Sequence, residues 1–277
     1  MDYRGLLDET ASERQLVHVE HIPARHAEFA EPERPLPAAL METLGRRGID
    51  RLWSHQAAAL DHLRAGRHVA ISTGTASGKS LCYQLASLEA LLEDPAARAL
   101  YVFPTKALAR DQLRSVRGYV LPGVASAAYD GDTPPDERLW VRRHARLVVT
   151  NPDMLHFGVL PSHAQWSSFL AGLRFVVVDE MHTLRGVWGA HVALILRRLR
   201  RLCERYGSEP VFCCSSATVG DPGGLAERLC GVPMEVVTED ASPSGERKFA
   251  LWNPPLASDD GSRRRSSHVE TATLLSS

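Results

Sequence analysis

The stretch "ISTGTASGKS", residues 71–80, decides the fold of this 277-residue chain. Its end, Gly-Lys-Ser at 78–80, fits the end of the pattern G-x-x-x-x-G-K-[ST]. Thr73 stands where that pattern has its first glycine, and Gly74 comes one place too late. An apolar run at 68–72 precedes the stretch, and a helical pattern follows it. This strand–turn–helix context is the one that a phosphate-binding loop requires.

Short apolar runs of β type alternate with helical patterns from residue 49 onward. Several runs are continuously apolar, as expected for strands buried on both faces of a parallel sheet. The alternation predicts an α/β fold with a doubly wound parallel sheet and ligands at the carboxyl ends of the strands. The expected strands are 68–72, 99–103, 125–129, 146–150, 174–179 and 211–216, and the clearest helices are 79–94 and 191–206.

Three regions are expected along the chain. Residues 1–48 form a polar N-terminal extension with a short helix that Gly48 ends. Residues 49–240 form the α/β domain, and 241–277 form a segment that leads away from it. That last segment contains a polar linker with a basic run (258–267) and then a pattern that begins like a capped helix.

The composition is that of an ordinary globular protein, with 44% hydrophobic residues, 23% charged residues and a net charge of −1. This net charge gives the protein no overall positive field of the kind that indicates a nucleic-acid partner, although a local groove can be basic on a neutral protein. No apolar run is long enough to span a bilayer, and the N-terminus lacks signal-peptide features, so a cytoplasmic protein without a membrane partner is expected. Reduced, mostly buried thiols are expected for the five cysteines, Cys82, Cys203, Cys213, Cys214 and Cys230.

The chemistry of a nucleotide site follows from two stretches. In the loop, the backbone N–H groups of Ala76 to Ser80 would face phosphates, and Lys79 would neutralise the β- and γ-phosphates. The Ser80 hydroxyl would ligate Mg²⁺. In "FVVVDEMH", a buried strand ends in Asp179 and Glu180. Such a pair supplies a second Mg²⁺ contact and a carboxylate that polarises an attacking water.

With "DEMH" (179–182) the chain resembles the first RecA-like domain of a superfamily 2 helicase of the DEAD/DEAH kind. In this superfamily the first position of the phosphate loop is often not glycine. The remaining motifs follow in order: "LWSHQAAAL" (52–60, Q motif), "TGTASGKS" (73–80, motif I), "PTKALARDQ" (104–112, motif Ia), "YDGD" (129–132, a DNA-contact turn), "TNPDMLH" (150–156, motif Ib) and "SAT" (216–218, motif III).

The resemblance implies a role for each matched residue. Lys79, Asp179 and Glu180 would be catalytic, with Ser80 and Asp179 holding Mg²⁺. The ATP-binding residues would be Gln56, which reads the adenine edge, and Thr73, Gly74, Thr75, Ala76, Ser77, Gly78, Lys79 and Ser80. The nucleic-acid contacts would be Thr105, Lys106, Gly131, Asp132, Thr150 and Asn151. Coupling between phosphate state and nucleic acid would use His182, Ser216 and Thr218.

A finer resemblance is to the bacterial YprA-like (MrfA) DNA helicases, over roughly residues 17–275. It implies an ATP-dependent DNA helicase that moves 3′ to 5′ on single-stranded or partly duplex DNA and serves DNA repair. No match to motifs V and VI follows residue 218, so a second RecA-like domain with its arginine finger is expected to be missing.

Two alternatives remain open. The chain could be a truncated nucleotide- and nucleic-acid-binding module with little or no hydrolysis by itself. It could also be an RNA helicase of the DEAD-box type, which the segment "DEMHTLRGVWGAHV" (179–192) disfavours.

Overall fold

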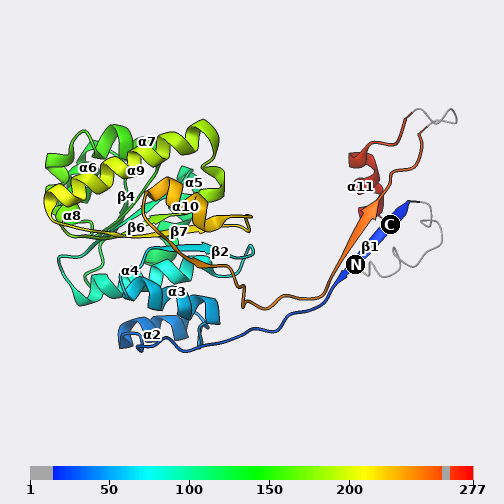
Figure 1. Cartoon of the computed structure of the whole chain (residues 1–277), viewed down its shortest axis with the longest axis horizontal. Helices are drawn as coiled ribbons and strands as arrows, with labels where there is room; N and C mark the ends of the chain where they lie inside the picture. The colour runs from blue at the N-terminus through cyan, green and yellow to red at the C-terminus, as the bar shows by residue number, and fades with distance from the viewer. Residues whose placement is uncertain (1–14, 258–262, 277) are drawn as a thin grey trace. The chain divides into compact units, whose positions relative to one another are not determined.

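The computed structural model describes residues 15–257 and 263–276, which fall into two compact units (Figure 1). One unit is Ala27–Ser242. The other combines the described parts of Met1–His26 and Pro243–Ser277. Within the described ranges, no helix is both long enough and apolar enough to cross a membrane.

The larger unit is built on a seven-stranded sheet in the order β4-β5-β3-β6-β7-β2-β8, with every pairing parallel. The predicted parallel sheet is confirmed, and all six expected strands are present within one or two residues of their expected bounds. The edge strand β8 was not predicted. The strands are β2 Val69–Ser72, β3 Arg98–Val102, β4 Ser126–Ala128, β5 Leu147–Thr150, β6 Leu173–Val178, β7 Val211–Ser216 and β8 Glu235–Val237.

Helices cover both faces of this sheet (Figure 1). Neighbouring residues of each central strand pack in opposite layers of the core. Val69 and Ile71 of β2 pack in one layer, and Ala70 between them packs in the other. The first layer contains α2 (Ala38–Arg46), α3 (Ser54–Arg64), α4 (Lys79–Glu93) and α5 (Lys106–Arg117). The second contains α6 (Pro135–His144), α7 (Pro152–Met154), η2 (Leu155–Val159), η3 (His163–Trp166), α8 (Ser167–Ala171), η4 (Met181–Thr183), α9 (Gly186–Tyr206) and α10 (Pro222–Cys230).

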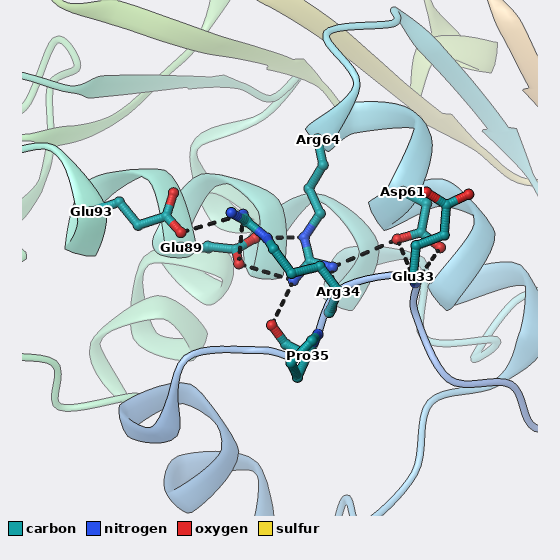
Figure 2. A network of polar contacts seen from close by, with 7 residues as sticks. All are labelled: Glu33, Arg34, Pro35, Asp61, Arg64, Glu89 and Glu93. Carbon is teal, nitrogen blue, oxygen red and sulfur yellow. Dashed lines mark hydrogen bonds and ion pairs between the residues drawn. The ribbon is translucent and has the colours of Figure 1, made fainter.

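The segment before α2 is held against the helices α3 and α4 by a network of charged side chains (Figure 2). The Arg64 guanidinium of α3 donates to both carboxylate oxygens of Glu89 in α4, at 2.8 and 2.9 Å. Glu89 is 3% exposed, and it also accepts from Arg34 at 3.1 Å. The N–H of Glu33 donates to Asp61. A buried carboxylate is tolerated here because two guanidinium groups pair with it.

The predicted short helix is α2, which ends at Arg46 with Gly48 at φ +71° just beyond it. It lies in the same compact unit as the sheet. In the other unit, β1 (Leu16–Ile22) pairs antiparallel with β9 (Arg247–Trp252). The expected C-terminal helix is α11 (Ser267–Ser276), while part of the predicted polar linker, 258–262, lies outside the described residues. All five cysteines are buried free thiols, as predicted.

Candidate functional site

The strand order brings the predicted motifs to one edge of the sheet. The carboxyl ends of β6, β7 and β2 are neighbours, and they lead into the "DEMH" stretch, the "SAT" stretch and the phosphate loop. The carboxyl ends of β3, β5 and β4 continue the same edge and lead into the predicted nucleic-acid residues. We call the two halves of this edge the nucleotide half and the nucleic-acid half, after the residues predicted on each.

The phosphate loop turns through two left-handed residues, Ala76 at φ +62° and Gly78 at φ +67°. Thr75 and Ala76 are exposed, so the turn faces solvent. Lys79 begins α4, and its Nζ donates to the carbonyls of Thr73 and Gly74, at 3.0 and 2.5 Å. The ammonium therefore lies folded back over the loop.

Hydrogen bonds of two hydroxyl groups connect Thr73, at the start of the loop, to Ser77. The Thr73 and Ser77 hydroxyls lie 2.6 Å apart, and Ser77 Oγ donates to the Gly74 carbonyl at 2.8 Å. Both side chains are buried. Thr73 thus closes the loop by a side-chain hydrogen bond at the position where the general pattern has glycine.

Gln56 is buried against the loop at the start of α3. Its Oε1 accepts from the Trp53 N–H at 3.0 Å, and its Nε2 donates to the Gly78 carbonyl at 3.3 Å. A Cβ at Gly78 would lie 2.5 Å from that Nε2, so a side chain there would displace Gln56 and would also sit on a left-handed backbone that favours glycine.

A cavity of about 560 Å³ opens beside Gln56 and Gly78. Phe29, which the sequence analysis missed, lines it, and the Arg51 guanidinium lies 4.5 Å above the Phe29 ring. Nothing in the sequence pattern marks Phe29, because it lies far from the motifs along the chain. A larger open groove, of about 840 Å³, lies between α9 and α10, and neither Lys79 nor Asp179 lines it.

Asp179 is 8% exposed and its carboxylate accepts three hydrogen bonds. Oδ2 accepts from the Tyr83 hydroxyl at 3.1 Å, and Oδ1 accepts from the Ser215 hydroxyl and from the Glu180 N–H. Burial, and then the Asp179 charge, raise the pKa of Tyr83 well above its ordinary value, so its hydroxyl stays protonated and donates. A buried tyrosine of α4 therefore holds Asp179, one of the two predicted Mg²⁺ ligands.

Glu180 and His182 follow Asp179 on a strained turn. Glu180 has φ +54° and a side chain that is 34% exposed. Its Oε2 lies 3.2 Å from Nδ1 of His182, but this buried nitrogen makes no hydrogen bond of suitable geometry with the described residues. A glutamate in the left-handed region costs conformational energy, which is typical of functional sites.

On the nucleic-acid half, Lys106 and Asp132 meet. Lys106 Nζ donates to Asp132 Oδ1 at 2.7 Å, and Arg110 donates to Oδ2 at 2.7 Å. The hydrogen bond from Lys106 is the main cause that lowers the pKa of the Asp132 carboxyl. A Cβ at the neighbouring Gly131 would lie 3.5 Å from Lys106 Nζ. Arg110 was missed because it lies inside the stretch matched to motif Ia, but the resemblance assigned it no contact.

The other predicted nucleic-acid residues have local structural partners. Thr105 Oγ1 caps α5 by accepting from the Leu108 N–H at 3.4 Å, and Asn151 Oδ1 caps α7 by accepting from the Met154 N–H at 2.8 Å. Thr150 is 1% exposed, and its hydroxyl donates to the Tyr129 carbonyl at 2.7 Å. The Thr150 side chain is therefore not offered to solvent.

The helix η4, which contains the predicted coupling residue His182, packs against β7, which ends at Ser216. Ser216 is buried and donates to the Ala217 carbonyl at 2.7 Å, whereas Thr218 is exposed. Ser72, at the end of β2, also donates to the Ala217 carbonyl, at 3.1 Å. This turn is therefore tied to the strand that leads into the phosphate loop.

Comparisons with known proteins place the chain in a family. The family model "DEAD/DEAH box helicase" matches residues 53–223. The uncharacterized ATP-dependent helicase YprA of Bacillus subtilis is 45% identical over 248 residues, covering 87% of this chain and 33% of that relative. The ATP-dependent helicase HRQ1 of Saccharomyces cerevisiae is 43% identical over 236 residues, covering 82% of this chain and 22% of its own length.

A crystal structure of the DUF1998 helicase MrfA bound to DNA superposes with a TM-score of 0.94 and 40% identity, over 99% of this chain and 37% of that one. The chain thus spans roughly a third or less of the curated relatives described above. The predicted resemblance is confirmed, and the chain belongs to the DEAD/DEAH box helicase family.

Proposed function

We propose that the unit Ala27–Ser242 binds ATP with Mg²⁺ on the β2, β6 and β7 half of the edge, and nucleic acid on the β3, β4 and β5 half. The observation that carries the nucleotide site is the left-handed turn at Ala76 and Gly78, which leads into Lys79 at the start of α4, while Tyr83 of the same helix donates to Asp179.

ATP binding is assigned to the loop and to Gln56. The left-handed turn at Ala76 and Gly78 exposes backbone N–H groups at the start of α4, where the helix dipole favours an anion. Lys79 gives up the Thr73 and Gly74 carbonyls and pairs with phosphate oxygens instead. Phe29 and Gln56 border the cavity of about 560 Å³, which we assign to the base.

The residues present fit a Mg²⁺ ion held together with phosphates. Mg²⁺ prefers oxygen ligands and is commonly bound by one or two protein groups plus substrate phosphates. Ser80 and Asp179 supply such oxygens, and the described residues contain no group of three or more His, Cys, Asp or Glu side chains that would hold a metal by themselves. The bound ion would neutralise charge on the phosphates.

Glu180 is the residue proposed to hold and polarise the attacking water. Its side chain is partly exposed, unlike that of the buried Asp179, so it can reach a water beside the phosphates. The hydrogen bond from the Glu180 N–H to Asp179 Oδ1 fixes the two carboxyl-bearing residues relative to each other.

The activity of the whole protein is proposed to be that of an ATP-dependent DNA helicase, with movement 3′ to 5′, a repair role and a second RecA-like domain that completes the ATP site. Relatives named as ATP-dependent helicases and a neighbour bound to DNA support this proposal. A cytoplasmic location is supported by five free, buried cysteines.

The alternative of a binding module is favoured for the 277 residues alone, because the chain covers only 33% of the YprA relative. ATP hydrolysis by this chain is measured with single-stranded DNA, with RNA and with neither, and Glu180→Gln is the control. If DNA stimulates ATP hydrolysis by the chain and Glu180→Gln abolishes it, the hypothesis of a binding module without hydrolysis is overturned. Stimulation by RNA but not by DNA would overturn the DNA assignment.

A further inference from the structure

Gly74, the glycine that stands one place too late for the phosphate-loop pattern, is not required by its backbone. It is absent from the glycines with positive φ. A Cβ at this position would instead lie 2.8 Å from Oδ2 of Asp240, closer than real Cβ contacts. The missing side chain therefore makes room for a carboxylate from a distant part of the chain.

Asp240 uses that room to bind the loop. The Gly74 N–H donates to Asp240 Oδ2 at 3.2 Å. The other oxygen, Oδ1, accepts from the N–H and the hydroxyl of Ser242, at 2.9 and 2.6 Å. One carboxylate thus bridges the phosphate loop and the segment 240–242.

His55 makes a second bridge between the same two parts. The Ala241 N–H donates to His55 Nδ1 at 3.3 Å, and His55 Nε2 donates to the Ser77 carbonyl at 2.9 Å. A backbone N–H can only donate and a carbonyl can only accept, so this pair of contacts selects the neutral ring with its proton on Nε2. The ring is buried, with 3% of its surface exposed.

These contacts meet the loop away from its predicted phosphate-facing N–H groups, which belong to residues 76–80. Asp240 therefore does not compete with a phosphate for the same donors. It fixes the start of the loop at Gly74, while His55 fixes the carbonyl of Ser77. After Ser242 the chain passes into the other compact unit.

We infer that Asp240 is a positioning residue for the phosphate loop, and that the Asp240–Gly74 and Ala241–His55–Ser77 contacts form a latch between the loop and the segment 240–242. The latch couples nucleotide binding to that segment. Coupling of this kind is reciprocal: if the latch strengthens nucleotide binding, the nucleotide strengthens the latch by the same factor. The coupling rests on the proposed ATP site, but the latch itself does not.

The latch is tested first without nucleotide, in the 277-residue chain. Asp240→Asn removes the charge that Gly74 binds, and Glu239→Gln removes the neighbouring, exposed charge as a matched control. Hydrogen exchange of peptides containing Gly74 is expected to be about tenfold faster in Asp240→Asn, since a hydrogen bond to a charged group is lost. Glu239→Gln leaves it unchanged. Unchanged exchange in Asp240→Asn overturns the latch.

The coupling is tested with a fluorescent ATP analogue and Mg²⁺. Asp240→Asn is expected to raise the Kd about fivefold or more, Glu239→Gln to leave it within about twofold, and Asp240→Glu to restore part of the affinity. The analogue slows exchange at Ala241 and Ser242 in the wild type and fails to do so in Asp240→Asn. Equal Kd values together with equal slowing overturn the coupling.

The two proposals fail in different ways. A wild-type chain that binds no ATP analogue overturns the proposed function, and exchange at Gly74 without nucleotide still decides the latch. Thermal melting of each variant separates a loss of positioning from a loss of folding. An Asp240→Asn protein that melts like Glu239→Gln and still binds ATP as the wild type does would overturn the positioning role.

Discussion

The phosphate loop contains two left-handed residues of different type, so exchanging them gives a matched pair of variants. Gly78→Ala adds a Cβ at φ +67° and places it 2.5 Å from Gln56 Nε2. The left-handed backbone costs an alanine about 1–2 kcal/mol. Moving Gln56 also weakens its hydrogen bonds to the Trp53 N–H and the Gly78 carbonyl, each worth about 0.5–1.5 kcal/mol.

Gly78→Ala is therefore expected to lower the free energy of unfolding by about 1–4.5 kcal/mol, after about 0.4–1 kcal/mol is regained from the stiffer unfolded chain. Ala76→Gly is expected to change it by less than about 1 kcal/mol, because relief of the φ +62° strain and the looser unfolded chain oppose each other. Urea unfolding followed by circular dichroism measures both. A loss in Gly78→Ala no greater than in Ala76→Gly would refute the reasoning.

Three further predictions concern stability and reactivity. Glu89→Leu is expected to lower the free energy of unfolding in urea by about 3–5 kcal/mol, because it leaves the buried Arg64 charge without its main partner. Adding Arg64→Met should recover most of this loss. An equal loss in the single and the double variant would contradict the importance of the buried pair. Burial raises the pKa of Cys82 to about 12 and of Cys203 to about 11, so these thiols should react with a disulfide reagent at pH 8 only after denaturation. Burial, and then a nearby arginine, lower the pKa of His68. The neutral ring therefore stabilises the fold above about pH 6.5. This contribution to stability is lost as the pH falls through the pKa of His68 in the folded protein. Melting temperatures from pH 7.5 to 5 should therefore fall more in the wild type than in His68→Gln.

Continuous apolar runs made the parallel sheet predictable. β5 and β6 are buried on both faces, and such strands carry no polar alternation to confuse them with surface elements. β8 escaped prediction because it has three residues, of which Glu235 and Val236 are exposed at the sheet edge. The pairing of β1 with β9 escaped because both strands are largely exposed and lie far apart in the sequence.

The candidate site divides in the same way. Motif residues such as Lys79 and Asp179 were predictable because their chemistry needs a fixed local spacing. Asp240 and Phe29 were not, since each reaches the loop or its cavity only through the fold. Thr150 was recognised from its motif, but the environment of its side chain was not predictable. Its burial and its hydrogen bond to the Tyr129 carbonyl depend on how β4 and β5 pair.

The central claim is that this chain binds ATP at the loop after β2. Titration calorimetry with ATP and Mg²⁺ tests it on the wild type, on Lys79→Ala and on Lys106→Ala, the last being a lysine on the nucleic-acid half of the edge. Lys79→Ala should weaken binding about tenfold or more, because a hydrogen bond between charged groups is worth about 1.5–3 kcal/mol. Lys106→Ala should bind as the wild type does. Equal affinity in Lys79→Ala and the wild type, or no binding by either, would contradict the account.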